Sequence, residues 1–277
     1  MTRSLTAVVL ILRPIADARL AVSHGAFAYT AALDFLLRLN PALSRALHLA
    51  APRKPLTCSL LTGAQERSGS YLVLDEHNTC TWRLTGLDPF VSECLLNLSP
   101  DLGGIRIGEA VFTIAAVCKV TEEHPEAGQD DYDAMWNRSM VQEPRSSVTF
   151  NFVSPTTFRT GRFEQPYPLP RLVFGLLAAA WNAYSHHPLP DFEDAIEKSV
   201  VLSNWRGETR RVELGSRRTT GFMGRFTYRV MDPSAELRRI ITLLSEYSFY
   251  AGVGWQTTHG MGQVRPQFGE TLTDPRQ

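Results

Sequence analysis

The densest group of residues that could do chemistry is a glycine-rich segment near the C-terminus, from Tyr250 to Arg265. Four glycines stand within eleven residues there: Gly252, Gly254, Gly260 and Gly262. Glycine tolerates positive φ and has no side chain, so the N–H groups of such a segment can line a concave surface that binds phosphates. The spacing excludes a P-loop, because Gly254 to Gly260 is one residue too long and no Lys-Ser/Thr pair follows.

Cysteine and histidine are not arranged as metal ligands. The cysteines at positions 58, 80, 94 and 118 stand far apart in apolar contexts, which predicts buried free thiols. His186 and His187 are adjacent, which is a poor basis for a metal site and predicts a solvated helix end before Pro188. We therefore expect neither a metal nor another cofactor.

Several segments resemble those of one family. The glycine-rich segment closely resembles the C-terminal glycine loop of the RAMP superfamily, particularly of its CRISPR repeat-RNA-processing endoribonucleases. Residues 221–228, GFMGRFTY, resemble the GF-x-GR strand of those enzymes, and residues 154–159, SPTTFR, resemble the turn after the first strand of their second domain. Residues 40–60 resemble the family's NP…LH…K-x-x-T-x-S-L segment, whose histidine and lysine belong to the active site. These two residues are His48 and Lys54 here.

The resemblance implies a metal-independent ribonuclease that cuts precursor CRISPR RNA within its repeat and releases mature crRNA. In such a reaction the 2′-OH attacks the adjacent phosphorus and expels the 5′-oxygen, leaving a 2′,3′-cyclic phosphate and a 5′-OH. The reaction needs a base, an acid and positive charge beside the developing phosphorane. His48 could serve as base or acid, and Lys54 could stabilise the charge of the transition state.

The sequence departs from the family pattern on the first helix, where some members carry a tyrosine that completes a His-Tyr-Lys set. The corresponding residue here is Leu33. Tyr29, one helical turn earlier, is a candidate replacement, as is His24 at the helix start, and Arg53 could add a second positive charge. The missing tyrosine leaves open a RAMP subunit that binds repeat RNA without cutting it. A nucleotide-binding enzyme is a further alternative, against which the P-loop spacing argues.

Arginines are concentrated in the second half of the chain. The net charge is zero, yet residues 203–239 hold nine arginines against four acids, whereas residues 121–143 hold seven acids against one arginine. This distribution predicts a basic face that binds RNA phosphates. The candidate RNA-binding residues are the four glycines of the loop and nine arginines: Arg159, Arg162, Arg206, Arg210, Arg211, Arg217, Arg218, Arg225 and Arg265.

Aromatic residues and one further histidine lie among these arginines. Trp205, Trp255 and Tyr250 are candidates for stacking on an unpaired base. The family resemblance puts the acid–base residue in the first domain. We therefore expect the glycine-rich segment to be a binding element and His259, which lies in it, to take no part in catalysis.

The apolar patterns predict an α+β protein with two successive β-α-β-β-α-β units, which are tandem ferredoxin-like (RRM-like) domains. The expected domains are residues 1–120 and 146–277, joined by an acidic linker at 121–145. In the first domain we expect strands at 5–13, 56–61, 71–74, 79–84 and 105–120, helices at 25–40 and 89–98, and a short helix capped by Asn40. In the second we expect strands at 147–153, 222–230 and 263–266, helices at 169–184 and 234–249, and a hairpin over 198–214 that turns at Arg206-Gly207.

The sequence and the resemblance also indicate location and partners. No apolar run reaches the ~18 residues of a membrane span, and the apolar stretch 6–12 is too short for a signal peptide, so we expect a cytoplasmic protein. The expected partner is a CRISPR repeat RNA folded as a stem-loop. Other subunits of a CRISPR effector complex are further candidates, and no membrane contact is expected.

Overall fold

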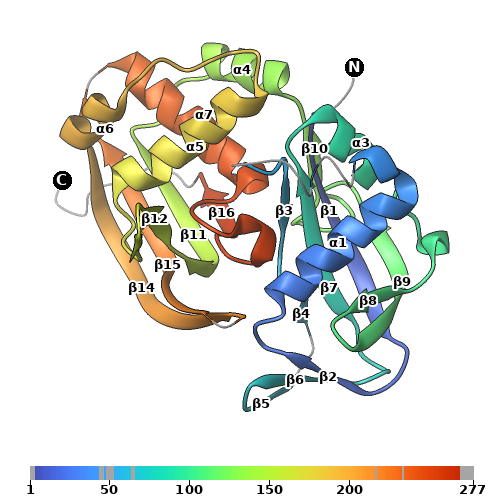
Figure 1. The fold of residues 1–277 in the computed structure, drawn as a ribbon. Helices are drawn as coiled ribbons and strands as arrows, with labels where there is room; N and C mark the ends of the chain where they lie inside the picture. The colour runs from blue at the N-terminus through green and yellow to red at the C-terminus, as the bar shows by residue number, and fades with distance from the viewer. Residues whose placement is uncertain are drawn as a thin grey trace. The chain divides into compact units, whose positions relative to one another are not determined.

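The computed structural model describes residues 4–43, 47, 53–63, 66–215, 217–232 and 234–268 (Figure 1). The chain forms two compact units. Unit 1 consists of residues 1–132, 212–219 and 256–261, and unit 2 consists of residues 133–211, 220–255 and 262–277. Two short segments of the second half therefore belong to the first unit.

Unit 1 is built on a seven-stranded antiparallel sheet whose main path is β3-β7-β1-β9-β8. Its strands are β1 (Leu5–Pro14), β3 (Leu56–Cys58), β4 (Thr62–Gly63), β7 (Cys80–Gly86), β8 (Ile105–Ile107), β9 (Ala110–Cys118) and β10 (Gly128–Asp130). The helices are α1 (Gly25–Leu39) and α3 (Pro89–Leu96), with the 3-10 turns η1 (Pro100–Leu102) and η2 (Thr257–His259). The strand order β3-β7-β1-β9, with α1 and α3 as crossovers, is that of a ferredoxin-like domain.

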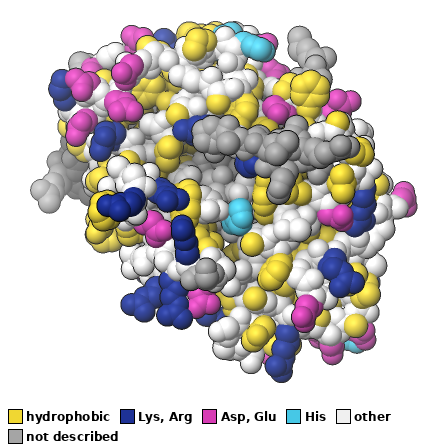
Figure 2. All heavy atoms as spheres, viewed as in Figure 1, with side chains coloured by type: hydrophobic (Ala, Val, Ile, Leu, Met, Phe, Trp, Pro, Cys, Tyr) yellow, Lys and Arg dark blue, Asp and Glu magenta, His cyan; other side chains and the backbone are white. Residues whose placement is uncertain are grey.

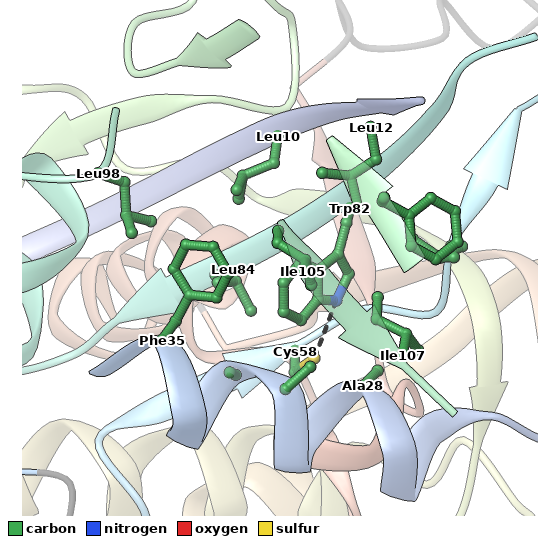
Figure 3. Close-up of a cluster of buried hydrophobic side chains, with 14 of the residues drawn as sticks. Leu10, Leu12, Ala28, Phe35, Cys58, Trp82, Leu84, Leu98, Ile105 and Ile107 are labelled. Carbon is green, nitrogen blue, oxygen red and sulfur yellow. Dashed lines mark hydrogen bonds between the residues drawn. The ribbon is translucent and has the colours of Figure 1, made fainter. Parts of the chain in front are cut away.

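The core of unit 1 lies between this sheet and α1, as Figure 3 shows. Ala28 and Phe35 of α1 are fully buried and face apolar side chains of the strands, among them Leu10 and Leu84. Trp82 is also buried, and its indole Nε1 donates a hydrogen bond to Cys58 Sγ at 3.2 Å. All four cysteines are buried and free, which confirms the prediction for them. This packing fixes α1, which carries Tyr29, against β3, which follows Lys54 in the chain.

Two predictions for strands in the first domain are wrong in detail. Residues 71–74 form β6 (Tyr71–Leu74), but this strand pairs with β2 (Ala18–Ala21) and β5 (Glu66–Ser68) in a separate three-stranded sheet. The apolar stretch 105–120 is not one strand but the hairpin β8–β9. Its turn contains Gly108 at φ +61°, a conformation that glycine adopts without strain.

The acidic segment 121–145 is not a linker. Gly128–Asp130 form β10 and pair with the first residues of β1, so this part belongs to the sheet of unit 1. The buried Tyr132 donates its hydroxyl proton to the carbonyl of Leu87 at 2.9 Å. Residues 132–141 form α4 (Tyr132–Val141). Of the seven acids, Asp130 and Asp133 lie on these elements and the other five lie in the turns and loops beside them. Charge patterning alone does not distinguish such a segment from a linker.

Unit 2 contains a second ferredoxin-like sheet in the order β14-β15-β11-β16. Its strands are β11 (Ser147–Thr156), β14 (Val200–Leu214), β15 (Arg217–Val230) and β16 (Val264–Gln267), and β12 (Phe158–Thr160) pairs with β13 (Phe163–Gln165). The helices are α5 (Pro170–Tyr184), α6 (Glu193–Ser199) and α7 (Ala235–Ala251). Buried aromatic rings join Phe150 of β11 to Phe174 of α5 and to Tyr228 of β15. The predicted tandem ferredoxin-like architecture is confirmed.

The hairpin of the second domain turns later than predicted. β14 continues through Arg206 and Gly207 to Leu214, and β15 starts at Arg217. Gly207 instead faces Gly224 across the ladder, where a Cβ on either residue would lie 2.3 Å from the partner strand's backbone. This glycine therefore allows a close approach of two strands, which a single sequence does not distinguish from a turn. Among the helices that the structure describes, none is long and apolar enough to span a membrane.

Candidate functional site

The glycine-rich segment uses most of its own amides inside the protein. Within unit 2, the N–H of Gly252 donates to the carbonyl of Ser248 at 3.0 Å and that of Gly262 donates to the carbonyl of Pro155 at 3.1 Å. Within unit 1, the N–H of Gly260 donates to the carbonyl of Cys58 at 3.0 Å. The hypothesis that these three amides are free to hold phosphates is therefore wrong. A contact between the loop glycines and RNA stays a prediction, resting on the shape of the segment.

Positive φ and close contacts explain why glycine stands at these positions. Gly254 and Gly260 have φ of +95° and +84°. A Cβ on Gly254 would lie 2.5 Å from the carbonyl oxygen of Thr157, and one on Gly260 would lie 2.5 Å from the side chain of Leu60. In unit 1, a Cβ on Gly25, the first residue of α1, would lie 2.0 Å from the carbonyl oxygen of His259. The turn η2 is thus seated directly on the start of α1.

We expect Gly260→Ala to destabilise the protein by about 1–3 kcal/mol, because a side chain at this φ is strained and its Cβ also collides with Leu60. The measurement is the free energy of unfolding in denaturant. Gly69→Ala is the matched control, since Gly69 has φ +61° with no atom within 4 Å of the added Cβ. Equal losses for the two variants would show that the contact with Leu60 is unimportant.

Tyr29 and His259 lie side by side in unit 1. Tyr29 is half-buried on α1, and its ring centroid is 5.1 Å from that of His259 in η2. Burial, and secondarily the neighbouring Cys58 thiol, raises the pKa of the Tyr29 phenol. Burial lowers the pKa of His259, and Thr258 Oγ1 lies 2.8 Å from its Nδ1. Both side chains therefore remain neutral at physiological pH.

His24, the other candidate to replace the missing tyrosine, has no free ring nitrogen. Its Nδ1 lies 2.8 Å from the carbonyl oxygen of Ala21, and its Nε2 accepts a hydrogen bond from the N–H of Leu61 at 2.8 Å. The residue is buried, and burial lowers its pKa despite the backbone hydrogen bonds that oppose this shift. These two hydrogen bonds make His24 a structural link between the start of α1 and the strand region after β3. Leu33 packs against the core of unit 1.

Lys54 is held at a defined place in unit 1. Its ammonium donates a hydrogen bond of 2.6 Å to the carbonyl oxygen of Leu47, a buried core residue. That carbonyl belongs to the peptide bond that joins Leu47 to His48. His48 itself lies outside the described residues, as does most of the short second helix. The predicted helix cap is confirmed, because Asn40 Oδ1 accepts a hydrogen bond from the N–H of Leu43 at 3.1 Å. Arg53 is half-buried.

The five arginines of residues 206–218, around the turn of the β14–β15 hairpin, are all exposed, and Figure 2 shows Lys and Arg side chains gathered over this part of the surface. Arg210 pairs with Glu208 at 2.7 Å and Arg218 with Glu213 at 3.5 Å. Within the part of the chain that the structure describes, Arg206, Arg211 and Arg217 form no ion pair. Five arginines against two glutamates give residues 206–218 a formal charge of +3. These arginines form an exposed basic strip, as an RNA-binding hairpin requires.

The remaining candidate residues lie in different surroundings. Arg159, Arg162 and Arg225 are exposed, and Arg265 is half-buried. The Arg159 guanidinium lies over the Trp255 ring, 5.5 Å from its centroid. Trp205 is 63% exposed and parallel to the Phe226 ring at 6.3 Å, whereas Tyr250 is buried. Trp205 is thus the aromatic candidate with the most ring surface open to a base.

Among the described residues, no group of three or more His, Cys, Asp or Glu side chains could hold a metal ion. The His187 ring lies 2.8 Å from the Asp133 carboxylate and is stacked on Trp136 at 5.0 Å between ring centroids. His187 is therefore a packed residue and not the solvated helix end that its sequence suggested.

Comparisons with known proteins agree with the resemblance in the sequence. The family model of the CRISPR-associated endoribonuclease Cas6 matches residues 150–264. A Cas6 product complex is 30% identical to this chain, with a TM-score of 0.78, over 95% of this chain and all of that one. The chain belongs to the Cas6 family. Thermus thermophilus Cas6 is 28% identical, with a TM-score of 0.74, over 96% of this chain and 100% of that one.

A Cas6 endoribonuclease of Streptococcus thermophilus is 24% identical over 147 residues. The match spans 52% of this chain and 58% of that protein. The chain thus aligns with little more than half the length of this curated Cas6 relative.

One feature of this candidate site could not be found by sequence reasoning. Residues 256–261 belong to unit 1, which brings His259 beside Tyr29 although 230 positions separate them in the chain. No local pattern indicates such a contact, because it depends on tertiary packing. The one signal in the sequence is the glycine at position 25. A glycine there leaves room for another segment to approach the start of α1, but it does not say which segment does so.

Proposed function

We propose that this chain cuts CRISPR precursor RNA within its repeat, by attack of a 2′-OH on the adjacent phosphorus. The 2′-oxygen loses its proton and bonds to phosphorus, the bond from phosphorus to the 5′-oxygen breaks, and that oxygen takes up a proton. The products are a 2′,3′-cyclic phosphate and a 5′-OH. The observation that carries the proposal is the similarity to a Cas6 product complex over almost the whole chain.

His48 and Lys54 are the first residues that we assign to this reaction. An imidazole exchanges a proton near neutral pH, so His48 serves as an acid or a base. Lys54 stabilises the negative charge that builds up on the phosphorane, a contribution typically worth a few kcal/mol. The hydrogen bond from Lys54 to the Leu47 carbonyl supports this assignment, since it ties the ammonium to the peptide that leads into His48.

Tyr29 supplies a neutral hydroxyl that substitutes for the tyrosine that some family members carry at the position of Leu33. Its raised pKa keeps the phenol protonated, so it can donate a hydrogen bond to a phosphate oxygen or to the leaving group but does not act as a base. Its ring is half-buried on α1, one turn before Leu33.

RNA is held mainly by arginines of the second half of the chain. The exposed strip on β14 and β15 offers guanidinium groups to the phosphates of a stem, which is read by shape more than by sequence. Trp205 extends this surface with an exposed ring on which an unpaired base can stack.

We expect cleavage at one site in the repeat to be undiminished by EDTA, because the proposed reaction uses only side chains and the 2′-OH. The measurement uses end-labelled RNA of the CRISPR repeat encoded in the same genome, with and without chelator. Loss of cleavage in EDTA that is restored by magnesium would contradict the mechanism. Tight binding without cleavage under both conditions would favour a non-cleaving RNA-binding subunit.

A further inference from the structure

His259 is a histidine with one ring nitrogen held and the other available. Thr258 Oγ1 lies 2.8 Å from Nδ1. Within the residues that the structure describes, Nε2 has no hydrogen-bond partner, and it is not one of the buried atoms that lack a partner. Nε2 therefore reaches the surface. His24 of the same unit differs, because both of its nitrogens are bonded inside the protein.

The hydroxyl of Tyr29 is available in the same way. The described part of the chain contains no hydrogen-bond partner for it, and it too is absent from the buried atoms without partners. The two rings are 5.1 Å apart at their centroids, with 36° between their planes. An open imidazole nitrogen and an open phenol hydroxyl thus lie next to each other on one unit.

This pair is fixed by contacts that leave little room for movement. The carbonyl of His259 lies where a Cβ on Gly25 would be, and the next amide, of Gly260, donates to Cys58 of β3. Tyr29 is held by α1, whose inner face is buried in the core. Sites that bind or transform a ligand need such rigid support for the groups that act on it.

Three ionisable groups on the elements that contact η2 carry no charge at neutral pH. On α1 and its start these are Tyr29, with a raised pKa, and His24, with a lowered one. On β3 it is Cys58, whose pKa burial raises to about 12. The charged residues of these elements lie further along: Asp34 and Arg38 pair with each other on α1, and Arg53 and Lys54 precede β3. His259 is therefore not kept protonated by a neighbouring carboxylate.

We propose that His259 is a second catalytic histidine, whose Nε2 takes the proton from the attacking 2′-OH while the Tyr29 hydroxyl donates a hydrogen bond to the phosphate. This inference rests on the proposed function and gives His48 the complementary role of protonating the 5′-oxygen. One proton moves from the 2′-oxygen to His259 and one from His48 to the leaving oxygen, so water restores both histidines after the cut. The proposal replaces the expectation that His259 takes no part in catalysis.

The pH dependence follows from the lowered pKa of His259. A general base acts only when unprotonated, so the decline in cleavage rate on the acid side of the pH profile (the acid limb) begins only below about 6.5, the ordinary pKa of histidine. Removing the imidazole removes this acid limb from the pH profile. A purely structural role would not change the shape of that profile.

The test is single-turnover cleavage of labelled repeat RNA from the same genome, at saturating protein and across pH values on both sides of about 6.5. We expect His259→Ala and His259→Gln to cut about tenfold more slowly or worse, with unchanged RNA affinity and without the acid limb. Glutamine places a polar atom near the position of Nε2 but cannot take a proton, so it keeps the test valid if alanine disturbs the turn. The control is His77→Ala, an exposed histidine of unit 1.

The outcomes separate this inference from the proposed function. If the natural protein does not cut repeat RNA, the proposed function fails. If it cuts and His259→Gln cuts equally fast, only the role of His259 is overturned. A slower His259→Gln protein that keeps the acid limb would also overturn it, since the proton would then go to another group.

Discussion

His48→Ala should lower the maximal rate of RNA cleavage by about 10²-fold or more, which is the usual scale for losing an acid or base. RNA affinity should barely change, because the imidazole acts on protons that move in the transition state. Single-turnover kinetics across a protein titration separate the two quantities, since the plateau gives the rate and the midpoint gives the affinity. Lys54→Ala should slow cleavage too, because it removes the positive charge that is anchored at the Leu47 carbonyl.

His77→Ala provides the reference for a histidine removed without consequence. Its side chain is exposed on unit 1, and its Nε2 lies 3.9 Å from the carboxylate of Glu76. If His48→Ala and Lys54→Ala both cut at the natural rate, the reaction takes place elsewhere. A normal rate for His48→Ala combined with a slow His259→Ala would leave the catalytic imidazole on η2 alone.

Neutralising Arg206, Arg211 and Arg217, the arginines of residues 206–218 that form no ion pair with described residues, should have the second largest effect. We expect Arg206→Gln, Arg211→Gln and Arg217→Gln together to weaken RNA binding by roughly 10²-fold at physiological salt. Each substitution removes a guanidinium group and with it a charge-assisted hydrogen bond to an RNA phosphate. The dependence of affinity on salt should also become shallower, by about 2 to 3 in the slope of log K against log salt. The plateau cleavage rate should remain, since none of the three takes part in the chemistry.

A matched triple variant separates a local effect from a loss of net charge. Arg19, Arg67 and Arg106 are exposed arginines of unit 1 that we assign no role in binding. Their replacement by glutamine also removes three positive charges, but from a different part of the surface. Equal losses of affinity in the two triple variants would mean that overall charge, and not the hairpin, attracts the RNA.

Much of the fold follows from the sequence because its elements are strongly patterned. Helices α1, α5 and α7 begin and end within two residues of their predicted bounds, since each has a continuous apolar stripe and a defined start. The wrong predictions concern places where one residue type has two structural uses. The pattern predicts a turn at Gly207, which lies instead at a close approach of two strands.

The candidate site was predictable only in part. A motif identifies His48 and Lys54, but a motif does not show which residues from distant parts of the chain contact it. The hydrogen bonds that occupy His24, and the contact that joins Tyr29 to His259, arise from packing between segments distant in sequence. For the same reason the loop glycines were credited with free amides, whereas three of those amides complete the hydrogen bonding of neighbouring backbone.

The interleaved composition of unit 1 limits how this chain can be divided or recombined. A fragment that ends at residue 132 lacks residues 256–261. The Cys58 carbonyl then loses the hydrogen bond from the N–H of Gly260, and Gly25 loses its contact with the His259 carbonyl. The complementary fragment carries those six residues without the helix and strand that support them. A chimera that exchanges the C-terminal half with a relative therefore also exchanges part of the first unit. Such hybrids should fold best when Gly25, Leu60 and the 256–261 segment are inherited from the same parent.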